Sequence, residues 1–137
     1  MILLDTHAFV WTVGGDRRLG PRARAAVGEA ASGGGVLVSA ITPWEVALLV
    51  GKGRLRLGRE VGAWLEAALA LPGMVLAPIE PAIAVDSTRL PGDFHADPAD
   101  RLIVATSRHR SVPLLTADRA ILSYAANGYL HALDAAA

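Results

Sequence analysis

The chain has 137 residues, no cysteine, and thirteen acidic residues against thirteen basic ones, so its formal net charge is zero. Its mean hydropathy of +0.39 is too high for a disordered chain, yet no apolar stretch reaches the roughly 18 residues of a membrane-spanning helix. The composition therefore excludes a disulfide framework and a thiolate enzyme. The apolar opening lacks a basic leader region, so we expect a cytoplasmic protein without a signal peptide.

Short apolar stretches alternate with amphipathic ones along the chain. The predicted strands are residues 1–5, 36–39, 74–79, 113–118 and 129–133. The predicted helices are a short one after the first strand, residues 21–31, 43–50, 61–71, 81–90 and 97–110, and a short one ending at residue 124. Strands that alternate with helices indicate a mainly parallel sheet covered by helices on both faces. Without a repeat or a linker, we expect a single α/β domain over residues 1–137.

Four acidic residues fall where a predicted strand ends or a helix begins. They are Asp5 after the first strand, Glu45 after the second, Asp100 before the fourth and Asp118 after it. Ligand sites in parallel α/β sheets lie at the carboxyl ends of the strands, so these side chains can meet at one edge. Carboxylates that meet repel one another unless cations or protons balance them. Mg²⁺ or Mn²⁺ suits such an oxygen-only set, whereas zinc favours cysteine and histidine.

The stretch DPADRLIVATSRHR begins with two carboxylates three residues apart. Asp97 followed by Pro98 is typical of a helix start, so we interpret Asp97 as the cap of this helix. Asp100 could complete a capping box, but its place among the other acids favours a metal ligand. The remaining acids have structural alternatives as well, namely helix caps for Asp5 and Asp118 and the helix dipole for Glu45.

Four segments, MILLDTHAFVW, SAITPWEVALLVGKGRL, HADPADRLIVATS and LLTAD, occur in this order. They resemble the PIN-domain ribonucleases, specifically the VapC-type toxins of type II toxin–antitoxin pairs, from Met1 to about Leu133. The resemblance implies a PIN-like domain and an endoribonuclease that uses Mg²⁺ or Mn²⁺ to activate a water for RNA hydrolysis. It also implies a VapB-type antitoxin as partner.

The resemblance further assigns roles to individual residues. It implies that the catalytic, metal-binding quartet consists of Asp5, Glu45, Asp100 and Asp118. Thr6, Ser39 and Thr116 are similar to hydroxyl residues that support these acids in the family, and Asp97 matches an acid often found before the catalytic one. The alternative is a non-catalytic α/β interaction module that retains the PIN fold.

The apolar residues around the third predicted helix exceed what one helix face needs. They are Leu48, Leu49, Val50 and Leu55, beside Trp44 and Trp64. We therefore expect a symmetric homodimer, with an antitoxin tail bound over these helices and a basic side chain reaching toward the acids. Trp11 belongs with the other tryptophans to the core or the dimer surface. His7 is expected to pack or face solvent, and His95, His109 and His131 carry no pattern.

Overall fold

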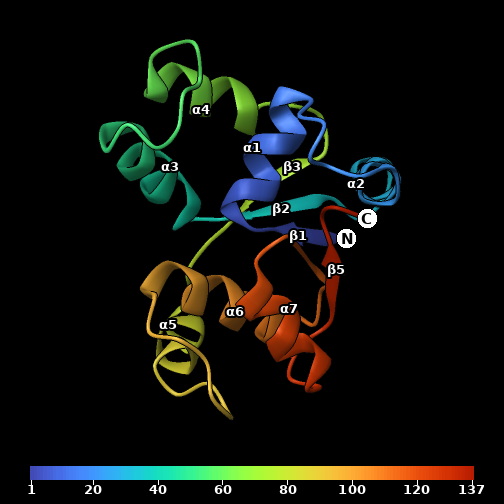
Figure 1. Ribbon diagram of the computed structural model, residues 1–137, viewed down its shortest axis with the longest axis vertical. Coiled ribbons are helices and arrows are strands. Elements are labelled where there is room, and N and C mark those ends of the chain that lie inside the picture. Colours follow the sequence, from blue (N-terminus) through green and yellow to red (C-terminus); the bar gives the residue numbers. More distant parts are fainter.

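A five-stranded sheet runs through the middle of the protein (Figure 1). The computed structural model describes residues 1–137. The strands are β1 (Ile2–Leu4), β2 (Val36–Ser39), β3 (Met74–Ala77), β4 (Leu114–Thr116) and β5 (Ala132–Asp134). They lie in the order β3-β2-β1-β4-β5, and every neighbouring pair is parallel. The predicted parallel α/β fold is confirmed.

Helices cover both faces of this sheet (Figure 1). One face carries α1 (Thr6–Gly14), α2 (Pro21–Ser32), α3 (Thr42–Gly51) and α4 (Val61–Leu69), and the other carries α5 (Pro81–Ser87), α6 (Pro98–Arg110) and α7 (Arg119–Ala126). Successive side chains of a strand point to opposite faces. Ile2 and Leu4 therefore pack in the first apolar core, while Leu3 between them packs in the second. None of the helices combines the length and apolarity that crossing a bilayer requires.

The chain changes direction across the sheet beside its central strand. It builds β1, β2 and β3 outward in one direction, and then returns past β1 to add β4 and β5 on the other side. Such a switch point is where α/β sheets bind ligands, beyond the carboxyl ends of the two strands. Asp5 follows β1 directly and Asp118 lies two residues beyond β4. The topology therefore brings together acids that are far apart in sequence.

The last strand was predicted at the wrong residues. It spans Ala132–Asp134 rather than 129–133, and its pairing with β4 begins at Leu114 opposite Ala132. Tyr129 is absent from the ladder because its ring stacks on Tyr124, with the ring centroids 4.5 Å apart. The helix predicted over 81–90 is also shorter, because Ser87 turns its hydroxyl back onto the carbonyl of Ala84 near the helix end.

The tryptophans and the apolar patch around α3 have mixed positions. Trp64 is buried against Phe9, with a ring-centroid distance of 5.5 Å, as expected of the core. Trp44 is 55% exposed, so it is not a core residue. Val50 and Leu55 pack partly against the chain's own core rather than facing outward, which leaves Trp44 and Leu48 as the exposed part of the predicted dimer patch.

Candidate metal centre

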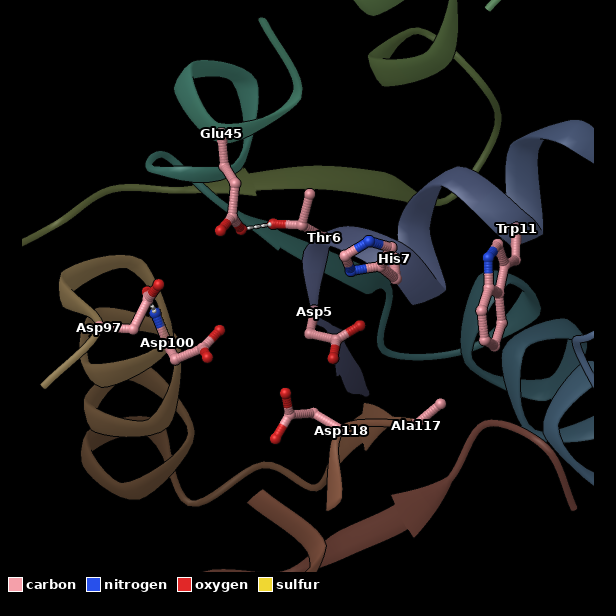
Figure 2. Close-up of a pocket in the computed structure, with 9 residues that line it drawn as sticks. All are labelled: Asp5, Thr6, His7, Trp11, Glu45, Asp97, Asp100, Ala117 and Asp118. Carbon is pink, nitrogen blue, oxygen red and sulfur yellow. Dashed lines mark hydrogen bonds between the residues drawn. The ribbon is translucent and has the colours of Figure 1, made fainter. Parts of the chain in front are cut away.

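An acidic cavity of about 360 Å³ lies at the carboxyl ends of the central strands. Figure 2 shows its carboxylates reaching into a common space from α3, from the start of α6 and from the ends of β1 and β4. The acids that line it are the four predicted ones, Asp5, Glu45, Asp100 and Asp118, together with Asp97. The structure thus brings the predicted quartet together around one cavity.

Asp5 is the buried acid of this cavity, with only 5% of its surface exposed. One carboxylate oxygen accepts a hydrogen bond of 2.8 Å from the backbone N–H of Ala8, which makes Asp5 the cap of α1. The other oxygen accepts a hydrogen bond from the hydroxyl of Thr116. Burial raises the pKa of Asp5, and the bonds from Thr116 and Ala8 oppose that rise. The fold therefore fixes this carboxylate by both oxygens.

Glu45 lies on the first turn of α3 and is also held by a hydroxyl. Thr6 donates a hydrogen bond to its carboxylate, drawn as a dashed line in Figure 2. The Oγ1 atoms of Thr6 and Thr42 are 3.3 Å apart, so Thr42 joins this chain of hydroxyls. No sequence pattern singled out Thr42.

Ser39 does not support an acid as the resemblance implied. Its hydroxyl is buried and accepts a hydrogen bond of 3.2 Å from the backbone N–H of Ile41. It therefore shapes the turn between β2 and α3 and contacts none of the carboxylates. Thr6 and Thr116, in contrast, each donate to one acid.

Asp97 caps α6, as predicted, by accepting a hydrogen bond of 3.0 Å from the backbone N–H of Asp100. Asp97 also belongs to the acidic site, which the interpretation as a cap alone missed. One carboxylate oxygen each from Glu45, Asp97 and Asp100 lie within 4.8 Å of one another. Asp97 is therefore both a helix cap and a member of the tightest acidic group in the cavity.

Asp118 is also both a helix cap and an acid of the cavity, although it lies outside the close group of Glu45, Asp97 and Asp100. Its carboxylate accepts a hydrogen bond of 3.0 Å from the backbone N–H of Ile121 and so caps α7. Its own backbone N–H donates to the hydroxyl of Thr116, at 3.0 Å. Thr116 thereby ties the segment of Asp118 to the carboxylate of Asp5.

Asp100, like Asp5, has surroundings that disfavour a negative charge. Its pKa is raised to about 7, first because burial disfavours the ionised form, and then because other carboxylates surround it. Those carboxylates belong to Asp97, Asp118, Glu45 and Asp5. A crowded set of oxygen donors that resists ionisation fits a hard divalent cation, which would neutralise the charge and accept carboxylate ligands. The residues present therefore suit Mg²⁺ or Mn²⁺.

His7, Trp11 and Ala117 also line the cavity, and His95 contacts one of its acids from outside the lining. His7 is exposed at the rim, and Trp11, although largely buried, faces the cavity on the side away from Asp100 (Figure 2). His95 was not predicted at all, yet its Nε2 lies 3.3 Å from the Oδ2 of Asp100. Its place two residues before Asp97 was the only available signal, and no spacing rule connects such a histidine to an acid beyond it.

A comparison with protein families identifies this arrangement. The PIN-domain model matches residues 2–127, which is most of the chain. The chain therefore belongs to the PIN-domain family. The family resemblance of the four sequence segments is confirmed.

Individual relatives agree with this assignment. Ribonuclease VapC22 of Mycobacterium tuberculosis (strain ATCC 25618 / H37Rv) is 35% identical over 123 residues, covering 90% of this chain and 91% of that protein. Among solved structures, VapBC2 from Rickettsia felis bound to a promoter DNA fragment matches with a TM-score of 0.69 at 14% identity, covering 97% and 98% of the two chains. FitAcB from Neisseria gonorrhoeae matches with a TM-score of 0.62 at 24% identity, covering 98% of each. These structures share the fold.

Proposed function

We propose that this protein is a Mg²⁺- or Mn²⁺-dependent endoribonuclease and the toxin of a type II toxin–antitoxin pair. The observation that carries the proposal is the acidic cavity, in which the predicted quartet and Asp97 converge from separate segments. The similarity to a protein named ribonuclease VapC22 over nearly the whole chain supports a nuclease. We propose that residues 1–137 form one catalytic unit.

Solved structures with a similar fold support a partner protein for this chain. The matching structures include a toxin–antitoxin complex from Klebsiella pneumoniae and DNA-bound VapBC from Salmonella typhimurium. These likenesses support a VapB-type antitoxin as the partner of this chain. A basic antitoxin side chain would find opposite charge in the cavity, and the exposed Trp44 and Leu48 on α3 offer apolar surface for a partner or a second copy.

We assign the chemistry to the carboxylates. A bound divalent cation polarises the scissile phosphate and assists ionisation of the attacking water. Asp5, Glu45, Asp100 and Asp118 would hold it, with Asp97 beside them. Thr116 and Thr6 fix the orientations of Asp5 and Glu45 through their hydroxyls, so these two ligands need little rearrangement.

One aromatic side chain lines this acidic cavity. Trp11 faces it, so an RNA strand that enters on this side meets an aromatic edge. The Arg18 guanidinium lies over the Trp11 ring, 4.9 Å from its centroid, and pairs with Asp16 at 2.7 Å. Both contacts hold the indole in place for such an encounter.

The nuclease proposal is tested by the products of a labelled oligoribonucleotide. Hydrolysis by water should leave a 5′-phosphate and a 3′-hydroxyl. Excess EDTA should stop cleavage, and Mg²⁺ or Mn²⁺ should restore it. The matched variant is Asp100→Asn, which keeps the shape and loses the charge. A 2′,3′-cyclic phosphate, or cleavage that persists in EDTA, would contradict the metal mechanism. Absence of cleavage in wild-type protein freed of antitoxin would favour the non-catalytic PIN-fold module.

A further inference from the structure

His95 contacts two acids of the cavity through its two ring nitrogens. It lies in the segment between α5 and α6, outside the set of residues that line the cavity. Its Nδ1 accepts a hydrogen bond of 3.3 Å from the backbone N–H of Asp97. Its Nε2 lies 3.3 Å from the Oδ2 of Asp100. One ring thus connects the cap of α6 to the acid one turn further along.

The hydrogen bond that Nδ1 accepts determines which ring nitrogen of His95 can act as a donor. A neutral imidazole carries one hydrogen, so a nitrogen that accepts a hydrogen bond leaves the hydrogen on the other nitrogen. Because Nδ1 of His95 accepts from Asp97, Nε2 carries the hydrogen, 3.3 Å from the Oδ2 of Asp100. This is a close contact and not an aligned hydrogen bond, and His95 is the protein donor nearest to an Asp100 carboxylate that accepts no hydrogen bond, whereas both oxygens of Asp5 receive hydrogen bonds.

The His95 ring is itself held by a row of aromatic side chains. Phe94 packs beside it with the ring centroids 4.3 Å apart, Tyr124 follows at 4.9 Å from Phe94, and Tyr129 stacks on Tyr124 at 4.5 Å. Tyr124 is buried, and its hydroxyl donates a hydrogen bond to the carbonyl of Pro91 in the same segment. The row therefore anchors the segment to the second core.

Arg101 fixes the backbone on either side of the ring. Its Nε donates to the carbonyl of Ser87 at 2.7 Å, at the end of α5. One of its terminal nitrogens donates to the carbonyls of Phe94 and His95, at 3.0 and 3.1 Å. The position of His95 is thus set by its ring neighbour, by its backbone carbonyl and by its own Nδ1.

We propose that His95 is a positioning residue of the metal centre, which orients the Asp100 carboxylate toward the cavity by offering its Nε2–H to Oδ2. The inference rests on the proposed metal-dependent function. The other oxygen of Asp100 is left free for a cation. Partners of this kind, which contact a ligand rather than the ion, typically change metal affinity by about 10- to 100-fold when removed.

Three substitutions separate positioning from packing. His95→Phe keeps a ring for the aromatic row and removes both nitrogens. His95→Gln can place an amide N–H near the position of Nε2, and His95→Asn reaches only the position of Nδ1. The matched control is His109→Phe, because His109 faces Glu80 at 3.8 Å and contacts no acid of the cavity.

The experiment is Mn²⁺ binding to the full chain by titration calorimetry without RNA, alongside thermal unfolding of the metal-free protein. Positioning predicts that His95→Phe and His95→Asn weaken Mn²⁺ binding about tenfold or more, while His95→Gln and His109→Phe stay close to wild type. Should His95→Phe fail to fold, the difference between Gln and Asn decides. Equal Mn²⁺ affinity in wild type and His95→Phe, or in Gln and Asn, would overturn the inference.

The failure of this inference can be distinguished from that of the proposed function. If wild type binds Mn²⁺, Asp100→Asn does not, and the His95 variants all bind alike, only the positioning role is wrong. If wild-type protein binds no Mn²⁺ at all, the metal centre and the positioning role are both wrong.

Discussion

The two sides of the acidic cavity hold their carboxylates in different ways. Asp5 is buried, and its two oxygens accept hydrogen bonds from Ala8 and Thr116. Asp100 lies across the cavity at the start of α6, with His95 3.3 Å from its carboxylate, and burial together with four other acids raises its pKa to about 7. Hydrogen bonds within the fold therefore hold the Asp5 carboxylate in place, whereas the Asp100 carboxylate has no such bonds and is surrounded by like charges.

The largest expected effect is on cleavage, where the two sides should behave alike. Neutralising either acid as Asp5→Asn or Asp100→Asn should reduce RNA cleavage by at least about a hundredfold, or roughly 2.7 kcal/mol of barrier, because both are proposed ligands. Initial rates on a labelled oligoribonucleotide measure this effect. Glu66→Gln is a suitable control, since Glu66 lies on α4 outside the cavity. Near wild-type turnover in either acid variant would refute that assignment.

Asp5 and Asp100 should contribute differently to the free energy of unfolding. Asp5→Ala removes the cap of α1 and leaves the buried hydroxyl of Thr116 without an acceptor, so we expect a loss of ~2 kcal/mol. Asp100→Ala removes a crowded charge, and the donor that it deprives of a partner is the part-exposed Nε2–H of His95, which water can reach, so at pH 8 it should stabilise the metal-free protein. Urea unfolding of both variants gives the comparison. Equal destabilisation by the two substitutions would show that the fold depends on both acids alike.

The pKa of Asp100 also predicts how stability varies with pH. Between its ordinary value of 3.8 and about 7, the folded chain keeps a proton on Asp100 that the unfolded chain has lost. Raising the pH through this window therefore lowers the free energy of unfolding of the metal-free protein. Asp100→Asn should reduce that slope, and Mn²⁺ should do so as well, because it binds the ionised carboxylates. Urea unfolding in EDTA at pH 5 and at pH 8 tests this; an unchanged slope in Asp100→Asn would assign it to other groups.

The smallest effect concerns Asp97, which caps α6 and also lies in the acidic group. Asparagine caps a helix about as well as aspartate, so Asp97→Asn should change stability by only a few tenths of a kcal/mol, whereas Asp97→Ala should cost ~1 kcal/mol. Because Asp97 is not assigned as one of the four ligands, Asp97→Asn should retain most of the cleavage rate. Thermal unfolding and initial rates of the two variants check this. A loss comparable to that of Asp100→Asn would make Asp97 a ligand.

The positions of the acids were predictable because they depend on short-range features. The short apolar strands β1, β2 and β4 end at a polar residue or directly before one, and parallel topology then brings these ends to one edge. The contacts between the acids and their supports depend instead on packing across the molecule. Thr6 and Glu45 are 39 positions apart, and Thr116 and Asp5 are 111 apart. Periodicity carries no information about such pairs, and Thr42, 36 positions from Thr6, was missed for this reason. His95 was missed although its partners are close in sequence, because no spacing rule connects such a histidine to an acid.

Apolar residues near the ends of helices and strands were the other source of error in the sequence-based prediction of the fold. Tyr129 looked like part of a strand because aromatic residues favour strands, but its ring joins the aromatic row instead. Val50 and Leu55 looked like surplus surface, yet they cover the chain's own first core. In both cases the residue is apolar, as the prediction required, but a turn of the chain brings it against a different partner. The sequence alone does not determine the direction of that turn.

The central position of β1 has a consequence for the order of events during synthesis. β1 leaves the ribosome before the other strands of the sheet, but it is completed on one side only when β4 arrives more than a hundred residues later. Pairing between segments so distant in sequence is slow relative to local helix formation. The cavity therefore cannot assemble on a half-made chain. The proposed nuclease centre would form only once most of the domain has emerged, and this delay would set the interval in which the proposed antitoxin must already be present.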